Sequence, residues 1–457
     1  MPRQKPLSYF LFLVALATYG TMAYTVQRHE TAQLLVLYFL LFGVYVWILK
    51  TATDKDAKFW VIASVLFRLS LLVAIPSLSD DFYRFIWDGR LIANGFHPFA
   101  ELPGFYLQND INIPGIDQSL YNQLNSPEYF TIYPPFAQFI FWVSVWISPQ
   151  SILGSVVVMK SFIIAAEVGS ILLLQKLLVR FNLNARNVLI YALNPLVILE
   201  LTGNLHFEAF VIFFILLALY LLLHNKIGQA GIAFAVSIAA KLLPIIFLPL
   251  FLIRIGLKRS LVFYGSVLVG SFILFFPLLN SEILAGFNES FTLYFKSFEF
   301  NASIYYLVRE YGYWVYGYNI IQTVGWKLGL ISAVMILLIA LWPFKSFYSK
   351  GELKFEQRIY KFPDDMATVP LVMMWIMLMY FLFTTTLHPW YICTLLMFSV
   401  FTSYRFVVIW SALIFLTYAG YTMNGFSEIL SLTVLEYVVV IGYLVYELIW
   451  RRKHSYS

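Results

Sequence analysis

Long apolar runs separated by short polar turns extend along almost the whole chain. A helix needs about 20 apolar residues to cross the hydrocarbon layer, and its backbone groups must be hydrogen-bonded within their own segment. The runs are far longer than the strands of a membrane barrel. The pattern therefore predicts an all-α polytopic membrane protein with about 12–14 transmembrane helices. The runs lie near 7–26, 33–49, 59–78, 152–179, 188–201, 208–223, 231–253, 261–279, 314–343, 368–387, 391–404, 406–423 and 431–450.

Two segments depart from this pattern. Residues 231–253 contain Lys241 and two prolines inside an apolar run. Because proline removes a backbone donor, we expect a broken or re-entrant pair of short helices there. Residues 136–148 follow Tyr133-Pro134-Pro135 and are short for a span. For both segments the sequence leaves open whether they cross the membrane fully.

Composition agrees with a membrane protein. The 457 residues are 61% hydrophobic and only 12% charged, against about 25% charged in an average globular protein. The single cysteine, Cys393, excludes an intramolecular disulfide and a cysteine-based metal site. The net charge of +6 is better explained by basic residues that orient the spans in the membrane than by binding to nucleic acid. No nucleic-acid partner is expected.

Lysine and arginine residues predict the orientation, since basic loops resist translocation. If the N-terminus is inside and the chain alternates, most of the 30 Lys and Arg residues fall on the inner side. Both termini are then expected in the cytoplasm. The first apolar run has no small-residue cleavage site, so we expect it to remain as a span.

The outer side collects the polar residues that could do chemistry. The longest loop, 79–134, carries many more acids than bases. Shorter outer segments hold Asn204, His206, Asn301 and the sequence His388-Pro389-Trp390-Tyr391. The charged residues of the loop are Asp80, Asp81, Asp88, Glu101, Asp110, Asp117 and Glu128, against Arg84 and Arg90.

The start of this loop predicts a short amphipathic helix at 81–94. Asp81, Arg84 and Asp88 share one face, and aromatic residues supply the other, so the helix is expected to lie in the membrane interface. Gly95 stands where a left-handed helix stop is expected. Asp80 and Asp81 fall at the helix N-terminus, where a charged carboxylate is favoured. One can cap the helix or hold Arg84, and the other can point into a pocket as a general base.

Several motifs, in this order and spacing, resemble bacterial mannosyltransferase-like members of the GT-C superfamily (glycosyltransferase family 87-like), which use polyprenyl-phosphate sugars. The similarity covers most of the chain. The motifs are Ser79–Arg90, Gly95–Phe99, Ile132–Gln138, Asn194-Pro195-Leu196, Gly203–His206, Lys241–Pro244 and His388–Tyr391.

The resemblance implies one transferase domain over 1–457, with 79–134 as its extracytoplasmic catalytic loop, in a bacterial inner membrane. The enzyme would move a sugar, expected to be mannose, from a polyprenyl phosphate to a glycan or glycolipid hydroxyl with inversion. The base is carried onto Asp80 or Asp81. No cofactor is expected, and a divalent metal is conceivable but not predicted.

Substrate binding needs hydrogen-bond donors or positive charge for the departing phosphate. Lys241 is the favoured cation, because a charge inside an apolar helix usually has a partner or a ligand; Lys296 and Arg309 are further outer-side cations. The candidate substrate-binding residues are Arg84, Trp87, Asp88, Tyr133, Asn204, His206, Lys241, Asn301, His388 and Tyr391.

The main alternative is a multispanning transporter or lipid flippase. Such a protein is expected to hold paired charges at the midplane and to consist of two related halves. Lys160, Glu167 and the interrupted segment 231–253 favour it. Lys160 and Glu167 are, however, expected to neutralise each other or packed neighbours. The chain shows no repeat between its halves, and its polar groups gather on one side.

Overall fold

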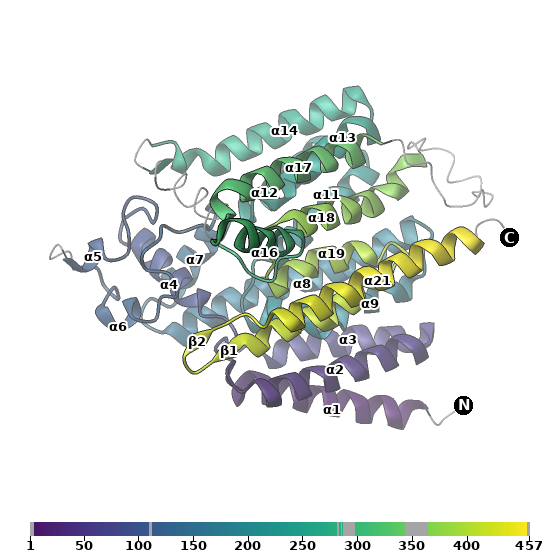
Figure 1. Cartoon of the computed structure of the whole chain (residues 1–457), viewed down its shortest axis with the longest axis horizontal. Helices are drawn as coiled ribbons and strands as arrows, with labels where there is room; N and C mark the ends of the chain where they lie inside the picture. The colour runs from purple at the N-terminus through teal and green to yellow at the C-terminus, as the bar shows by residue number, and fades with distance from the viewer. Residues whose placement is uncertain are drawn as a thin grey trace.

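The computed structural model is a bundle of roughly aligned helices, and it describes residues 4–108, 112–280, 283–284, 286, 298–342 and 364–454. Both ends of the described chain lie at one end of the bundle, whereas α4, α5, α6 and the β1–β2 hairpin lie at the other (Figure 1). The helices of the first half are α1 (Gln4–Tyr24), α2 (Thr31–Thr51), α3 (Asp54–Ser70), α4 (Asp81–Ala93), α5 (Phe105–Gln108), α6 (Gln118–Tyr121), α7 (Pro135–Ile147), α8 (Ile152–Arg180), α9 (Val188–Ala192), α10 (Pro195–Val197), α11 (Glu208–Leu223) and α12 (Ile227–Ala240).

The second half continues the bundle and ends with a long helix that runs back toward the termini (Figure 1). Its elements are α13 (Leu248–Arg254), α14 (Leu257–Phe275), α16 (Ile304–Tyr316), α17 (Ile321–Leu341), α18 (Val369–Phe383), α19 (Ile392–Ser399), α20 (Phe406–Leu413), β1 (Tyr421–Thr422), β2 (Gly425–Phe426) and α21 (Leu430–His454). Short 3₁₀ or π turns are η1 (Ala185–Asn187), η2 (Ile198–Gly203), η3 (Leu243–Phe247), η4 (Phe276–Leu278), η6 (Asp364–Thr368), η7 (Pro389–Tyr391) and η8 (Ile414–Gly420).

The protein is an all-α polytopic membrane protein, as the sequence predicts. In the described part of the chain, 7 helices are long and apolar enough to span a membrane, or up to 8 if the bent pair Pro195–Gly203 and Glu208–Leu223 is one span. Several other predicted spans fold as shorter apolar helices, among them Phe406–Gly420. The segment 136–148, which the sequence leaves open, also forms a short apolar helix, Pro135–Ile147. Long spans are therefore fewer than the apolar runs, because prolines and polar residues interrupt some of those runs.

The interruption predicted for 231–253 is confirmed. α12 ends at Ala240, and Lys241 has the extended backbone angles φ −162° and ψ 136°. The 3₁₀ turn η3 and the short helix α13 follow. The break leaves Lys241 at a helix end with its side chain available for contacts outside its own helix.

α4 forms where the sequence predicts it, and Gly95 follows it with φ +83°. Its aromatic side chains are largely buried by protein, however. Phe85 stacks on Phe141 of α7 with ring centroids 4.5 Å apart, and Trp87 is fully buried. The expectation that the aromatic side chains of this helix contact the headgroup region is wrong, because α7 and the rest of the loop cover its apolar face.

Charged side chains inside the bundle are neutralised by neighbours. Arg68 of α3 pairs with Glu167 of α8 at 2.9 Å, and both are fully buried. Lys160 donates hydrogen bonds to the carbonyls of Leu71 and Ala74 at 3.0 and 2.7 Å. Glu167 is therefore neutralised by a packed neighbour, as one of the two expectations has it, whereas Lys160 is held by hydrogen bonds to carbonyl groups. These contacts attach α3 and the chain after it to α8.

Close packing at Gly89 sets the position of α4. A Cβ atom there would lie 2.6 Å from the carbonyl oxygen of Phe141 and 2.9 Å from a methyl group of Val145.

We predict that Gly89→Ala lowers the free energy of unfolding by about 1–3 kcal/mol, the usual cost of overpacking. Thermal unfolding in detergent measures this effect. Gly43→Ala is the control, since nothing lies within 4 Å of that position, and equal stability of the two variants would contradict the prediction.

Candidate active site

Asp80 and Asp81 lie at the start of α4, where both are partly exposed. Arg28, in the turn between α1 and α2, pairs with Asp80 at 2.6 Å, and the Asp80 side chain is 35% exposed. The amide of Asn125 donates a hydrogen bond to Asp81 at 2.6 Å. The two carboxylates therefore face different partners, one a cation and the other a neutral amide.

Arg84 and Asp88, unlike Asp80 and Asp81, are buried and bound by neighbouring residues. Arg84 Nε pairs with Asp88 at 2.9 Å, and its guanidinium also donates to the carbonyl of Tyr129 at 2.9 Å. Gln138 of α7 donates to the second oxygen of Asp88 at 2.9 Å. The expectation that Arg84 is held by Asp80 or Asp81 is wrong, because Asp88 on the next helical turn lies buried beside it. These contacts attach α4 to its loop and to α7.

Tyr133 lies between the acids and the rest of the candidate site. The centroid of its ring lies 4.8 Å from that of Phe85 and 5.5 Å from that of Phe141. Burial raises the pKa of the Tyr133 hydroxyl well above its usual value, and the charges of Asp81 and Asp88 raise it further. The hydroxyl therefore stays protonated. Pro135 stands in the first turn of α7.

A second polar group surrounds Glu200, which is fully buried in the π-helical turn η2. Tyr418 donates to Glu200 at 2.7 Å, and Asn204 donates to it at 3.3 Å. His206 Nε2 lies 3.4 Å from the same carboxylate. Leu205 between them has φ +64°, a conformation that side chains rarely adopt. Such π turns and strained residues are frequent at functional sites.

Lys241 joins this group from the broken end of α12. It forms an ion pair with Glu208, the first residue of α11. Its ammonium also lies 3.9 Å from the ring centroid of Tyr391, a cation–π contact. The Glu208 side chain is 3% exposed and that of Lys241 is 29% exposed. The cation is thus fixed in position but still reachable.

His388 completes the group within a stack of rings. Trp390 lies between His388 and His206, with centroid distances of 4.4 and 3.7 Å. Burial lowers the pKa of His388 to about 3, and the charges of Lys241 and His206 lower it further. The imidazole is therefore neutral at ordinary pH and has one nitrogen that donates and one that accepts.

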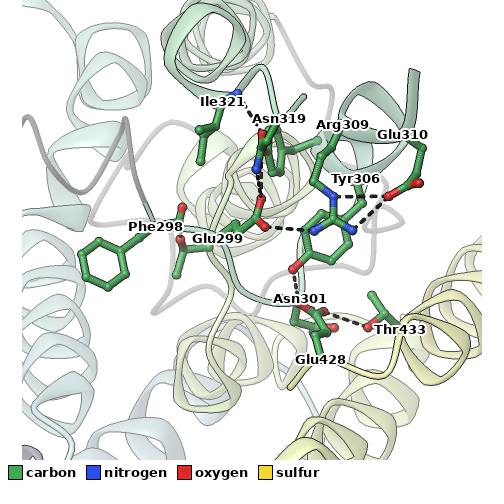
Figure 2. A network of polar contacts seen from close by, with 12 residues as sticks. Phe298, Glu299, Asn301, Tyr306, Arg309, Glu310, Asn319, Ile321, Glu428 and Thr433 are labelled. Atoms are coloured by element: carbon green, nitrogen blue, oxygen red, sulfur yellow. Dashed lines mark hydrogen bonds and ion pairs between the residues drawn. The ribbon is translucent and has the colours of Figure 1, made fainter. Parts of the chain in front are cut away.

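Asn301 is fully buried and is held by the region around α21 instead of facing an open pocket. Its backbone N–H donates to Glu428 at 3.1 Å, and its side-chain amide donates to Glu436 at 3.1 Å. Figure 2 shows Asn301 and Glu428 within a larger network of polar contacts. Phe300, the preceding residue, stacks toward His388 at 4.5 Å. Asn301 is therefore attached to Glu428 and α21, beside a residue whose ring reaches His388.

A series of side-chain contacts links the acids to the histidine group. Arg28 lies 5.1 Å from the ring of Tyr421, and Tyr421 lies 4.8 Å from Phe426. Phe426 stacks on Phe300 at 4.9 Å, and Phe300 reaches His388. The structure thus brings Asp80 and Asp81 to the same end of the bundle as Lys241, His206, His388 and Tyr391. Trp87, Arg84 and Asp88 remain buried within the loop.

Some residues of this arrangement were not identified from the sequence. Arg28 follows the first apolar run as an ordinary loop cation, and nothing in its spacing indicates a pairing with Asp80. Glu200 and Glu208 flank the motif at 203–206, so their positions gave a local signal. Of the other predicted residues, Asp110 and Lys296 lie outside the described residues. Across the described ranges, no three His, Cys, Asp or Glu side chains are grouped so as to hold a metal ion.

The helical membrane fold and its polar end group fit a membrane-embedded group-transfer enzyme. The family model described as "Alpha-(1→6)-mannopyranosyltransferase, N-terminal domain" (MptA/B family) matches residues 2–256, which is more than half of the chain. The chain belongs to this family. Family membership confirms the expected likeness to mannosyltransferases of the GT-C type and supports glycosyl transfer over transport. A comparison with curated proteins finds no match.

The low pKa of His388 makes stability depend on pH. Between about pH 3 and the ordinary value of 6.5, the unfolded chain binds a proton at this residue that the folded protein does not. Stability therefore falls as pH is lowered through this range. We predict that His388→Phe, which keeps a stacking ring but cannot titrate, removes on the order of 2 kcal/mol of the stability lost between about pH 7 and pH 5. Thermal unfolding at both pH values, compared with wild type, measures this; identical pH dependence would refute it.

Proposed function

We propose that the protein transfers mannose from a polyprenyl phosphate to a hydroxyl group of a glycan or glycolipid, with inversion, on the extracytoplasmic face of the membrane. The observation that carries the proposal is the shared end of the bundle: two partly exposed carboxylates and a fixed lysine lie there, linked by aromatic contacts. Family membership supplies the class of sugar transferred. The lipid-linked donor is our inference, and the proposed reaction needs no cofactor.

Asp80 and Asp81 are the proposed source of the general base. The acceptor hydroxyl attacks the anomeric carbon and gives its proton to a carboxylate, while the bond from that carbon to the phosphate oxygen breaks. The electron pair of the broken bond leaves with the phosphate. Attack from the face opposite the leaving group inverts the anomeric carbon. Asp88 is unsuited to this role because its two oxygens accept from Arg84 and Gln138.

The departing phosphate needs positive charge or hydrogen-bond donors. Lys241 is the proposed cation, because Glu208 and the ring of Tyr391 hold it while part of its side chain stays exposed. Neutral His388 can donate one further hydrogen bond. Arg28, beside Asp80, is a second cation near the acids.

We infer that the protein is in a bacterial inner membrane, with the site facing away from the cytoplasm and both termini on the cytoplasmic side. The described ends of the chain lie at the end of the bundle opposite α4, α5 and α6 (Figure 1). Basic residues lie in the last turns of helices that run toward the end of the bundle where the termini are; Lys50, Arg180 and Arg254 are examples. This distribution supports the orientation that basic loops favour.

Loss of the base should abolish most of the activity. We predict that Asp80→Asn or Asp81→Asn lowers the rate of mannose transfer from radiolabelled polyprenyl-phosphate mannose by about 10²–10⁴-fold, the usual contribution of a general base. The larger of the two losses identifies the base. Glu101→Gln is the control, because Glu101 is an exposed acid of the same loop, and it should retain full activity. Wild-type rates in both aspartate variants would eliminate the proposed base.

Loss of the lysine should weaken stabilisation of the leaving phosphate. We predict that Lys241→Met, combined with Glu208→Gln to avoid a buried unpaired acid, lowers kcat/KM for the donor by about 10²–10³-fold. Lys176→Met is the matched control. Lys176 makes a similar cation–π contact, with its ammonium 5.5 Å from the ring centroid of Tyr220, but it lies near the C-terminal end of α8, away from the candidate site. Equal activity of the double variant and the control would remove Lys241 from the mechanism.

A further inference from the structure

The helix α16 has one polar, packed face and one exposed apolar face. Tyr306, Arg309 and Gly312 are buried on the first. On the other, Leu307 is 74% exposed and Trp314 is 83% exposed, and Tyr311 is exposed between them. Leu307, Tyr311 and Trp314 are spaced at i, i+4 and i+7, which is one face of a helix, and the exposed Tyr318 follows just beyond the helix end. In the described structure nothing covers this stripe.

The polar face is attached to the segments that form the candidate site. Arg309 pairs with Glu299 at 3.0 Å and lies 4.2 Å from the ring of Tyr306. Tyr306 donates a hydrogen bond to Glu428, which also holds the backbone N–H of Asn301. Figure 2 shows these side chains converging from α16 and from the start of α21. The orientation of α16 is therefore fixed, and its apolar stripe points away from the protein.

α16 directly precedes a candidate membrane span in the chain. α16 ends at Tyr316, and the candidate span α17 begins at Ile321, after a turn at Gly317 with φ +79°. The 13 residues of α16 are too short to cross the hydrocarbon layer, which takes about 20. The exposed side of α17 continues with Trp326 and Leu330. The apolar stripe of α16 is thus continuous with a surface that faces lipid.

We propose that α16 lies in the headgroup region of the bilayer at the active-site end, with Leu307, Tyr311, Trp314 and Tyr318 against phospholipid. Tyrosine and tryptophan are enriched at this depth because they combine an apolar ring with a polar group. The polar face of α16 is bound by the protein, so its apolar face is the side left for lipid. The partner is the phospholipid bilayer, and α16 sets the height of the Phe300–His388 contact relative to it.

Spin labels at three exposed positions test the proposal in the intact protein. The single cysteine, Cys393, is fully buried and is replaced by alanine. Single cysteines are then introduced as Trp314→Cys, Met423→Cys or Leu268→Cys and labelled with a nitroxide. Met423, in the β1–β2 turn, is 80% exposed and serves as the aqueous reference. Leu268, at the middle of the span that contains α14, is 71% exposed and serves as the hydrocarbon reference.

The measurement is the collision rate of each label with oxygen and with a water-soluble nickel chelate. It is made in nanodiscs of phosphatidylethanolamine and phosphatidylglycerol that hold one copy each. We expect the oxygen-to-chelate ratio at position 314 to lie between the references, several-fold above that at 423. A ratio equal to that at 423 would place α16 in water, and a ratio equal to that at 268 would place it in hydrocarbon; either result overturns the proposal. The outcome does not depend on catalytic activity, so it is separate from the test of the proposed function.

Discussion

A charge that is removed from water inside a membrane protein must be paired, and this constraint organises the structure. Arg68 pairs with Glu167, Arg84 pairs with Asp88, and Lys160 is surrounded by carbonyl groups. All of these groups are buried, and each attaches one segment to another. The charges of the candidate site, Asp80 at the start of α4 and Lys241 at the break after α12, are also paired but stay partly exposed. Burial therefore separates the charges that hold the bundle together from those that remain open to a substrate.

The hydrophobic pattern predicted much of the local structure. The helix at 81–94, its stop at Gly95 and the break near Lys241 depend on neighbouring residues in sequence, so their signals are local. The burial of α4 was not predicted, because it depends on packing against α7. The number of long spans could not be predicted well from the sequence, because short and broken helices have the same apolar composition as long ones.

The candidate site was predicted in part for the same reason. Lys241, His206, His388 and Tyr391 lie together, although they come from separate segments. Arg28 was missed because its pairing with Asp80 joins two loops that are far apart in sequence. Asn301 was interpreted as a pocket residue, yet its contacts are with Glu428 and α21. Such long-range contacts leave no periodic trace in the sequence.

The contact of Asn301 with α21 has a consequence for how the protein is made. The family match ends at residue 256, whereas Phe300, His388 and the glutamates that hold Asn301 all come later in the chain. Glu436 is the last of these residues to emerge from the ribosome. A nascent chain that already carries the acids of α4 therefore lacks some contacts of the candidate site until α21 has been synthesised and inserted. The contacts around Asn301 can form only after residue 436 has left the ribosome.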